Sequence, residues 1–204
     1  LALSENRLSW FLPSALSRLT ALRVLSVDRN SILGNIPTEL GLFTSLAHLE
    51  MGGNQLSGSL PTHLGRLTML SFLGVGYNRL SGSIPTELGA LKDLEIIDLD
   101  KNQFSGSIPT ELGQCTLLKY FSVFSNSLTG TIPAEFGQLK KVLELIMFEN
   151  ALTGTLPTHL GSMIALFNLA VASNQITGSI PTEFGELTNL EWFTAADNKL
   201  QGTI

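Results

Sequence analysis

The chain has 204 residues, of which 44% are hydrophobic and 14% are charged, and its formal net charge at pH 7 is −5. Nucleic-acid binding needs a basic face for the phosphates, so this charge argues against a nucleic-acid partner. A membrane-spanning helix needs about 18 consecutive apolar residues, and no run in this sequence approaches that length. The composition therefore indicates enough apolar residues for a core and no membrane span in this segment.

A single repeat length organises the sequence from one end to the other. Asparagine returns every 24 residues, at Asn6, Asn30, Asn54, Asn78, Asn102, Asn126, Asn150, Asn174 and Asn198. All eight prolines keep the same period, at Pro13, Pro37, Pro61, Pro85, Pro109, Pro133, Pro157 and Pro181. A fixed period in the twenties predicts a solenoid, in which each repeat contacts only its neighbours.

The apolar residues recur at fixed places within each repeat. Around Asn78 they are Leu70, Leu73, Val75, Leu80, Ile84, Leu88 and Leu91, in the pattern L-x-x-L-x-L-x-x-N-x-L-x-G-x-I-P-x-x-L-G-x-L. This pattern resembles plant-type leucine-rich repeats, which occur in receptor-like kinase ectodomains and polygalacturonase-inhibiting proteins. The phrase I-P-T-E-L-G is also similar to leucine-rich-repeat proteins of diatoms and other stramenopiles.

The resemblance covers the whole chain and implies its architecture. It predicts an α/β solenoid with a curved parallel β-sheet on the concave face, a short second sheet, and 3₁₀ or short-helix turns on the convex side. We expect residues 1–204 to form one solenoid of about eight repeats. Because the chain opens in mid-motif and carries no capping segment, we interpret it as a fragment of a longer chain that lacks both caps.

Each repeat is expected to contribute its elements in the same order. Leu73 and Val75 alternate with Phe72, Gly74 and Gly76, which is the period-two pattern of a half-buried strand. Nine such strands would form a parallel sheet with neighbours about 4.8 Å apart. In the family, the G-x-I-P phrase then forms part of the second sheet, and T-E-L-G forms a turn of helix or 3₁₀ helix.

The asparagines are predicted to be structural. Each follows a strand where the chain turns inward, and a side-chain amide can both donate to and accept from the backbone groups left unpaired there. The internal members of this ladder are Asn30, Asn54, Asn78, Asn102, Asn126, Asn150 and Asn174.

The positions six, four and two residues before each Asn should face outward on the concave sheet, and they carry large side chains. The predicted partner-binding residues are Phe72, Ile96, Asp98, Asp100, Tyr120, Phe124, Ile146 and Phe148. A cluster of exposed aromatic residues favours an interface, and its acidic edge favours a partner with basic groups. The alternative is that the aromatic residues cover the sheet against one another, because β-strands favour them.

Two further surfaces carry open alternatives. Gly52, Gly53, Gly74 and Gly76 leave a low stretch of sheet that could admit a ring or a close backbone approach, or that reflects drift between repeats. Ser/Thr pairs flank the mid-repeat glycines, at Ser57/Ser59, Ser81/Ser83, Ser105/Ser107, Thr129/Thr131, Thr153/Thr155 and Thr177/Ser179. Such rows are similar to ice-binding solenoids, but hydroxyl residues are also ordinary in a sheet.

The sequence offers little for catalysis, so we expect no enzyme, no cofactor and no metal site. His48, His63 and His159 are too dispersed to share a metal. Asp98 and Asp100 face the same side, but an open sheet is not expected to desolvate them for acid–base chemistry. Cys115, which stands where other repeats have leucine, is expected to be a small buried hydrophobe. Any kinase domain would lie outside this segment.

The leading interpretation is a non-catalytic module that recognises a protein or peptide with its concave face, as in receptor-like or inhibitor-like proteins. The alternative is a structural subunit of a large assembly, and ice binding is a minor alternative. The resemblance favours an extracellular or receptor-ectodomain location. The segment contains no N-x-Ser/Thr acceptor for glycosylation, which keeps an organellar or intracellular assembly as the alternative.

Overall fold

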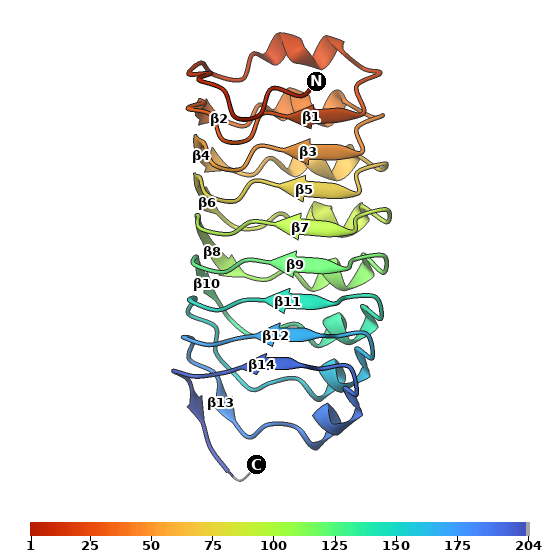
Figure 1. The fold of residues 1–204 in the computed structure, drawn as a ribbon, viewed down its shortest axis with the longest axis vertical. Coiled ribbons are helices and arrows are strands. Elements are labelled where there is room, and N and C mark those ends of the chain that lie inside the picture. Colours follow the sequence, from red (N-terminus) through yellow and green to blue (C-terminus); the bar gives the residue numbers. More distant parts are fainter. Residues whose placement is uncertain (203–204) are drawn as a thin grey trace.

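The computed structural model describes residues 1–202, apart from the side chains of Ser14 and Ser17. Each repeat forms one coil, and the coils stack in chain order from the N-terminal to the C-terminal end of an elongated solenoid (Figure 1). The predicted α/β leucine-rich-repeat solenoid is confirmed.

An eight-stranded parallel sheet forms one long face of the solenoid (Figure 1). Its strands, in spatial order, are β1 (Val24–Ser26), β3 (His48–Glu50), β5 (Phe72–Gly74), β7 (Ile96–Asp98), β9 (Tyr120–Ser122), β11 (Glu144–Ile146), β12 (Asn168–Ala170) and β14 (Trp192–Thr194). Nine strands were expected, but the first repeat contributes only an isolated bridge between Ala2 and Ser26. Neighbouring strands are in register at a 24-residue offset, so Phe72 pairs with Ile96 and Ile96 with Tyr120.

A second set of parallel strands lies beside the long sheet. Five of them form one sheet: β2 (Leu33–Asn35), β4 (Gln55–Ser59), β6 (Arg79–Gly82), β8 (Gln103–Ser107) and β10 (Ser127–Thr129). Two more, β13 (Thr177–Gly178) and β15 (Lys199–Leu200), pair near the C-terminal end. The glycine within each of β2, β4, β6, β8 and β13 has a positive φ, for example +76° at Gly58, a conformation that only glycine adopts without a steric penalty.

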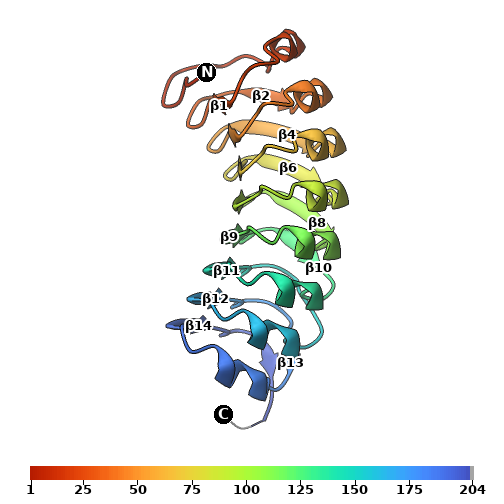
Figure 2. The ribbon, with the colours of Figure 1, turned by 90° about the vertical axis from the view of Figure 1, so that its right-hand side faces the viewer.

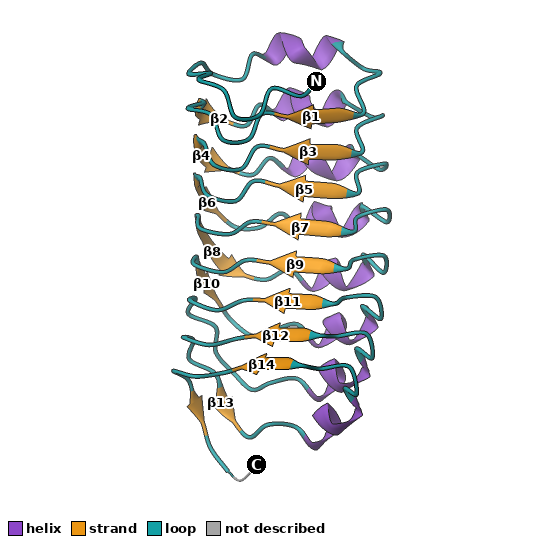
Figure 3. Ribbon diagram, in the orientation of Figure 1, coloured by secondary structure: helices purple, strands orange, loops and turns teal. Residues whose placement is uncertain are grey.

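The opposite, convex side is built from 3₁₀ helices, one per repeat (Figures 2 and 3). They are η1 (Ser14–Arg18), η2 (Thr38–Leu42), η3 (Thr62–Arg66), η4 (Thr86–Ala90), η5 (Thr110–Gln114), η6 (Ala134–Gln138), η7 (Thr158–Ser162) and η8 (Thr182–Glu186). Each begins directly after a proline, such as Pro85 with a φ of −65°, because proline fixes the backbone angle that a helix start requires.

Glycine sets the close spacing of these helices. A Cβ atom on Gly89 would lie 2.4 Å from the carbonyl oxygen of Glu111 in the next repeat, and one on Gly65 would lie 2.6 Å from that of Glu87. Because the neighbouring atom belongs to the backbone, it cannot move aside without shifting the whole coil. The convex glycines therefore let successive coils stack at the distance that the long sheet requires.

The asparagine side chains join the coils through the interior. The Asn102 amide donates to the backbone oxygens of Val75 (3.0 Å), Leu99 (3.2 Å) and Asp100 (3.1 Å), and its Oδ1 atom accepts from the Leu80 N–H (2.9 Å). The same set of four bonds recurs at the other internal asparagines, at Asn30, Asn54, Asn78, Asn126, Asn150 and Asn174. One amide thus links its own repeat to the preceding one, while the leucine, isoleucine and phenylalanine side chains fill the core around it.

Candidate ligand-binding site on the concave face

The concave face carries two rows of large side chains. Phe72, Ile96 and Tyr120 occupy the first position of three successive strands and lie directly beside one another across the sheet. Phe124 and Phe148 form the second row, just beyond the ends of β9 and β11. All five side chains are half-buried. Between the rows lie Gly74, Asp98, Ser122 and Ile146, so the polar residues divide the aromatic surface that the sequence predicts.

The rings of the second row form a pair. Phe124 and Phe148 stack with centroids 4.5 Å apart and an interplanar angle of 9°. A stack of this kind keeps two large apolar side chains rigid and leaves their outer surfaces open to a partner. In the first row, Phe72 stacks on His48, with centroids 4.2 Å apart.

A hollow of about 540 Å³ lies beside these rows, over the N-terminal half of the sheet. Gly52, Gly53 and Gly76 form its floor, and its sides are Asp28, Arg29, Glu50, Tyr77 and Asp98. The predicted low stretch of glycines is therefore a real depression, and three carboxylates surround it.

The glycines hold the carboxylates close to the sheet. A Cβ atom on Gly74 would lie 2.5 Å from Glu50 Oε2, and one on Gly76 would lie 2.7 Å from Asp98 Oδ1. The Gly52 N–H donates to Glu50 Oε1 at 3.1 Å. The Glu50 and Asp98 side chains thus lie across bare backbone, in space that any other residue type would fill.

Burial raises the pKa of Glu50 to about 7. The hydrogen bond from Gly52 opposes this shift, whereas the negative charges of Asp28 and Asp98 add to it. Within residues 1–202, neither Glu50 nor Asp98 takes part in an ion pair. Glu50 is therefore a carboxyl group that a cation in the hollow would stabilise in its ionised form.

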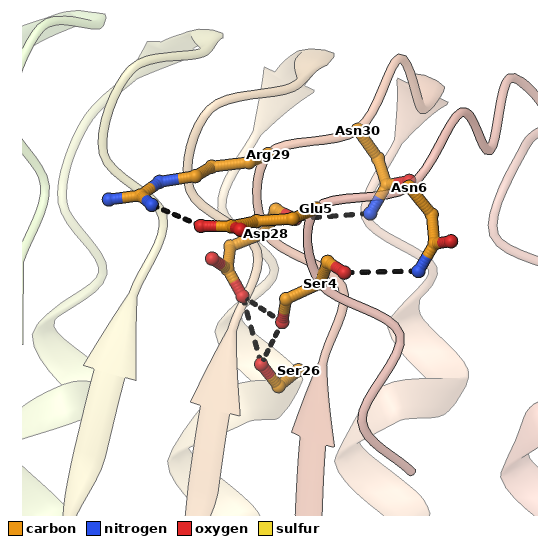
Figure 4. Close-up of polar contacts among 7 residues, drawn as sticks. All are labelled: Ser4, Glu5, Asn6, Ser26, Asp28, Arg29 and Asn30. Atoms are coloured by element: carbon orange, nitrogen blue, oxygen red, sulfur yellow. Dashed lines mark hydrogen bonds and ion pairs between the residues drawn. The ribbon is translucent and has the colours of Figure 1, made fainter.

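Asp28 is held differently, as Figure 4 shows. Its Oδ1 atom accepts hydrogen bonds from the hydroxyls of Ser4 and of Ser26 (2.9 Å). Although burial acts to raise its pKa, these bonds keep the pKa of Asp28 below the usual value. Arg29 is the cation at the rim, and it pairs with Glu5 in the preceding repeat, where both side chains are largely exposed. Arg29 nevertheless remains close enough to Glu50 for its positive charge to oppose the rise of the Glu50 pKa.

The expectation that an open sheet leaves Asp98 and Asp100 solvated is wrong for Asp100. This side chain is only 3% exposed, and its Oδ1 atom accepts bonds from the Ser122 hydroxyl (2.6 Å) and the Phe124 N–H (2.9 Å). Burial, together with the neighbouring Asp98, raises the pKa of Asp100 to about 8. Asp100 therefore links two repeats through hydrogen bonds. It is not exposed to a partner, although it is one of the partner-binding residues predicted from the sequence.

One column of site residues escapes the sequence analysis. The residue before each asparagine adopts a positive φ in every described repeat, at Glu5, Arg29, Gly53, Tyr77, Lys101, Ser125, Glu149, Ser173 and Asp197. This left-handed turn brings Tyr77 to the edge of the hollow. The Lys101 ammonium lies 4.9 Å from the centroid of the Tyr77 ring and 5.9 Å from that of Phe124. Lys101 thus lies between the hollow and the Phe124–Phe148 stack. The signal was present in the 24-residue period, as a variable column directly before the asparagines.

The hydroxyl rows lie on the strands of the second sheet or in the segments beside them, and they are mostly exposed. Their glycines leave room for the hydroxyl residue of the preceding repeat. A Cβ atom on Gly82 would lie 3.6 Å from Ser59 Cβ, and one on Gly154 would lie 2.6 Å from Thr131 Cγ2. These side chains therefore help to space the coils as well as presenting hydroxyls to solvent.

Among residues 1–202, no group of three or more His, Cys, Asp and Glu side chains is arranged to hold a metal ion. None of the described helices is long and apolar enough to cross a membrane. Cys115 is fully buried, as predicted, and burial raises the pKa of its thiol.

Comparisons with known proteins agree with this geometry. The Leucine Rich Repeat family matches residues 21–43, 45–67, 93–115 and 117–139. Among solved structures, the chain is similar to the ectodomain of the plant membrane receptor kinase GASSHO1/SCHENGEN3 from Arabidopsis thaliana in complex with CASPARIAN STRIP INTEGRITY FACTOR 2, with 40% identity and a TM-score of 0.99 over 100% of this chain and 24% of that one. It is also similar to the plant peptide hormone receptor RGFR1 in complex with RGF2, with 32% identity and a TM-score of 0.97 over 100% of this chain and 33% of the receptor.

A third similar structure is a plant ice-binding protein, with 26% identity and a TM-score of 0.77 over 100% of this chain and 74% of that one. No curated protein matches the sequence. The chain spans a third or less of the length of the two receptor structures.

The repeating strand, asparagine and 3₁₀ turn define the class: the chain is a leucine-rich-repeat protein. Its G-x-I-P phrases and its second sheet make these repeats the plant type, as in the plant receptor-kinase ectodomains to which it is similar.

Proposed function

We propose that this chain is a non-catalytic recognition module that binds a protein or peptide on its concave face. The observation that carries the proposal is the exposed surface of the Phe124–Phe148 stack, beside a hollow with unpaired carboxylates. Rigid aromatic side chains next to a depression are typical of interface hot spots. The similarity to two receptor ectodomains solved with bound factors supports the same conclusion. That similarity also supports a location outside the cell, as part of a receptor-like or inhibitor-like protein.

The test compares what the purified chain and its variants capture from extracts of cells that express it. Phe124→Asp should weaken partner binding by about 2 kcal/mol or more, the scale of a hot-spot residue, which is about a thirtyfold rise in Kd. Because the backbone of Phe124 donates to the buried Asp100, a charge here could also disturb the fold. Phe148→Ser is therefore the second variant, since it removes a stacked ring without adding charge.

The matched control is Glu87→Gln, an exposed change on the convex side. A partner that wild type and this control retain, and that both concave variants lose, supports the proposal. A partner that all four proteins retain equally excludes the concave face as the site. A fixed set of stoichiometric partners would instead favour the alternative of a structural subunit in a large assembly.

Ice binding is a second candidate, and a specific observation favours it. The exposed Ser and Thr side chains form rows across β4, β6, β8 and β10, and the chain covers 74% of a plant ice-binding protein of similar fold. Lysine in place of Thr131 and Thr155, which both project from this surface, would break the rows. If the second sheet binds ice, thermal hysteresis of the wild-type chain should be measurable and this double variant should abolish it. A wild-type chain without thermal hysteresis excludes this candidate.

A further inference from the structure

The two halves of the concave face have complementary chemistry at a defined separation. The hollow is acidic and has a glycine floor, and the Phe124–Phe148 stack is apolar. We propose that the ligand is an extended peptide segment that places a basic side chain, Arg or Lys, in the hollow and an apolar side chain on the stack, four residues apart. This inference rests on the proposed function and specifies its ligand.

The hollow suits an organic cation that arrives on a side chain. Glu50 and Asp98 have no ion-pair partner within residues 1–202, and Arg29 is paired with Glu5. The three carboxylates line one space of about 540 Å³ but are not arranged to hold a metal ion. A planar guanidinium or an ammonium group can reach carboxylates that are too far apart to coordinate one ion, because it presents several donors in different directions. The Lys101 ammonium already lies over the Tyr77 ring at the edge, so the carboxylates, and not this ring, are expected to hold the cation.

The stack suits an apolar side chain for independent reasons. Its two rings are parallel to within 9° and stacked with centroids 4.5 Å apart, so together they form one rigid apolar block. Lys101 closes the side that faces the hollow, with its ammonium near the Tyr77 and Phe124 rings. A second cation on the ligand would therefore be repelled at the stack, whereas an apolar group would gain from burial there. The two subsites thus differ in charge preference.

The register of the sheet sets the distance between the subsites. Gly52 and Gly76 follow β3 and β5, and Phe124 and Phe148 follow β9 and β11, so the two centres are three strand spacings apart. At about 4.8 Å per spacing this distance is about 14 Å, and an extended peptide advances about 3.3 Å per residue. Four residues cover that distance, and side chains four apart in an extended chain point to the same side. A peptide crossing the strands can therefore occupy both subsites at once.

Peptide display on the immobilised chain tests the inference. A library of random dodecapeptides is selected against four proteins. They are wild type, a hollow variant (Glu50→Gln/Asp98→Asn), a stack variant (Phe124→Ser/Phe148→Ser) and a convex control (Glu87→Gln/Glu135→Gln). Wild type and the control should enrich peptides with Arg or Lys four positions from an apolar residue, in either order. The hollow variant should lose the basic preference and keep the apolar one, and the stack variant should do the reverse.

One enriched peptide and its Arg→Gln counterpart then measure the contact. Fluorescence polarisation should show that the Arg peptide binds wild type about tenfold more tightly than its counterpart, the scale of a charge-assisted contact. The difference should vanish on the hollow variant. If Arg→Gln has the same effect on both proteins, or if enriched peptides bind the concave face without a basic residue, this inference is overturned while the proposed function stands. Peptides that bind all four proteins equally, or a library that yields no binder, overturn both.

Binding of the Arg peptide should also depend on pH. The pKa of Glu50 is about 7, so its charge increases between pH 6 and pH 8. The charged and titratable groups around it are Asp28, Arg29, His48 and Asp98, and burial lowers the pKa of His48. Because the pKa of His48 lies below its usual value, the change of charge at Glu50 is the one expected to govern binding in this interval. Affinity for the Arg peptide should therefore rise with pH, and the Gln counterpart should show no such rise.

Discussion

Glycines on the two faces of the solenoid are alike in the sequence, but they lie against different kinds of atoms and have different structural roles. On the convex side, Gly65 and Gly89 face backbone carbonyl oxygens of the next coil. On the concave side, Gly74 and Gly76 face the carboxylate ends of Glu50 and Asp98. A backbone carbonyl cannot move aside, whereas the end of a long side chain can. The convex glycines are therefore required by the fold, and the concave glycines shape a surface.

The largest expected effect tests the convex half of this contrast. Gly89→Ala places a Cβ atom 2.4 Å from the carbonyl oxygen of Glu111. Relief of the clash must push two coils apart, so we expect a loss of about 3 kcal/mol in the free energy of unfolding, the upper range for overpacking. Urea denaturation measures it. A change below about 1 kcal/mol would show that the coils separate easily, and the contrast between the faces would fail.

Asn102→Leu tests the interior that joins the two faces. The substitution leaves the Leu80 N–H and three backbone oxygens without the amide that now pairs with them. Unsatisfied buried polar groups make this change cost about 2 to 3 kcal/mol. Denaturation of the variant and of an exposed control, Lys92→Leu, separates this loss from the general effect of an added leucine. Equal stability of the two variants would mean that water replaces the amide.

The stability of the chain should fall as the pH rises from about 4 to about 8. The pKa of Asp100 is raised from its ordinary value of 3.8 to about 8 in the folded chain. Below pH 4 the carboxyl is protonated in both states, and between these values only the unfolded state ionises readily, so unfolding becomes easier as the pH rises. Asp100→Asn should flatten this dependence by at least about 1 kcal/mol, the equivalent of one pKa unit. An unchanged pH profile of unfolding would contradict the burial of this carboxyl.

The smallest expected change in stability comes from the concave face. In Gly74→Ala, the new Cβ atom displaces the flexible end of Glu50, and the gain from restricting the unfolded chain offsets the disturbance. We expect a change of less than about 0.5 kcal/mol in unfolding, together with a shift of the Glu50 pKa towards its ordinary value, followed by NMR titration. A loss as large as that of Gly89→Ala would erase the distinction between the faces.

The fold was predictable because its determinants repeat. Asn102 and Pro109 recur at 24-residue intervals, so the strand, the ladder and the 3₁₀ turn could be inferred from one repeat and extended to all. The site depends on differences between repeats and on contacts across them. The burial of Asp100 depends on Ser122 and Phe124, which lie 22 and 24 residues later. The positions of Tyr77 and Lys101 depend on a left-handed turn, and non-glycine residues give no sign of that conformation.

The uniform 24-residue register makes the concave face a ruler. Inserting one whole repeat between the hollow and the Phe124–Phe148 stack would move the two subsites apart by one strand spacing, about 4.8 Å, or about one and a half residues of extended peptide. The pattern of the interior would be kept, because each coil offers its neighbours apolar side chains and an asparagine at the same repeat positions. A change in the number of repeats between the subsites would therefore change the spacing of the two side chains that a peptide needs, while the pattern of the core stays the same.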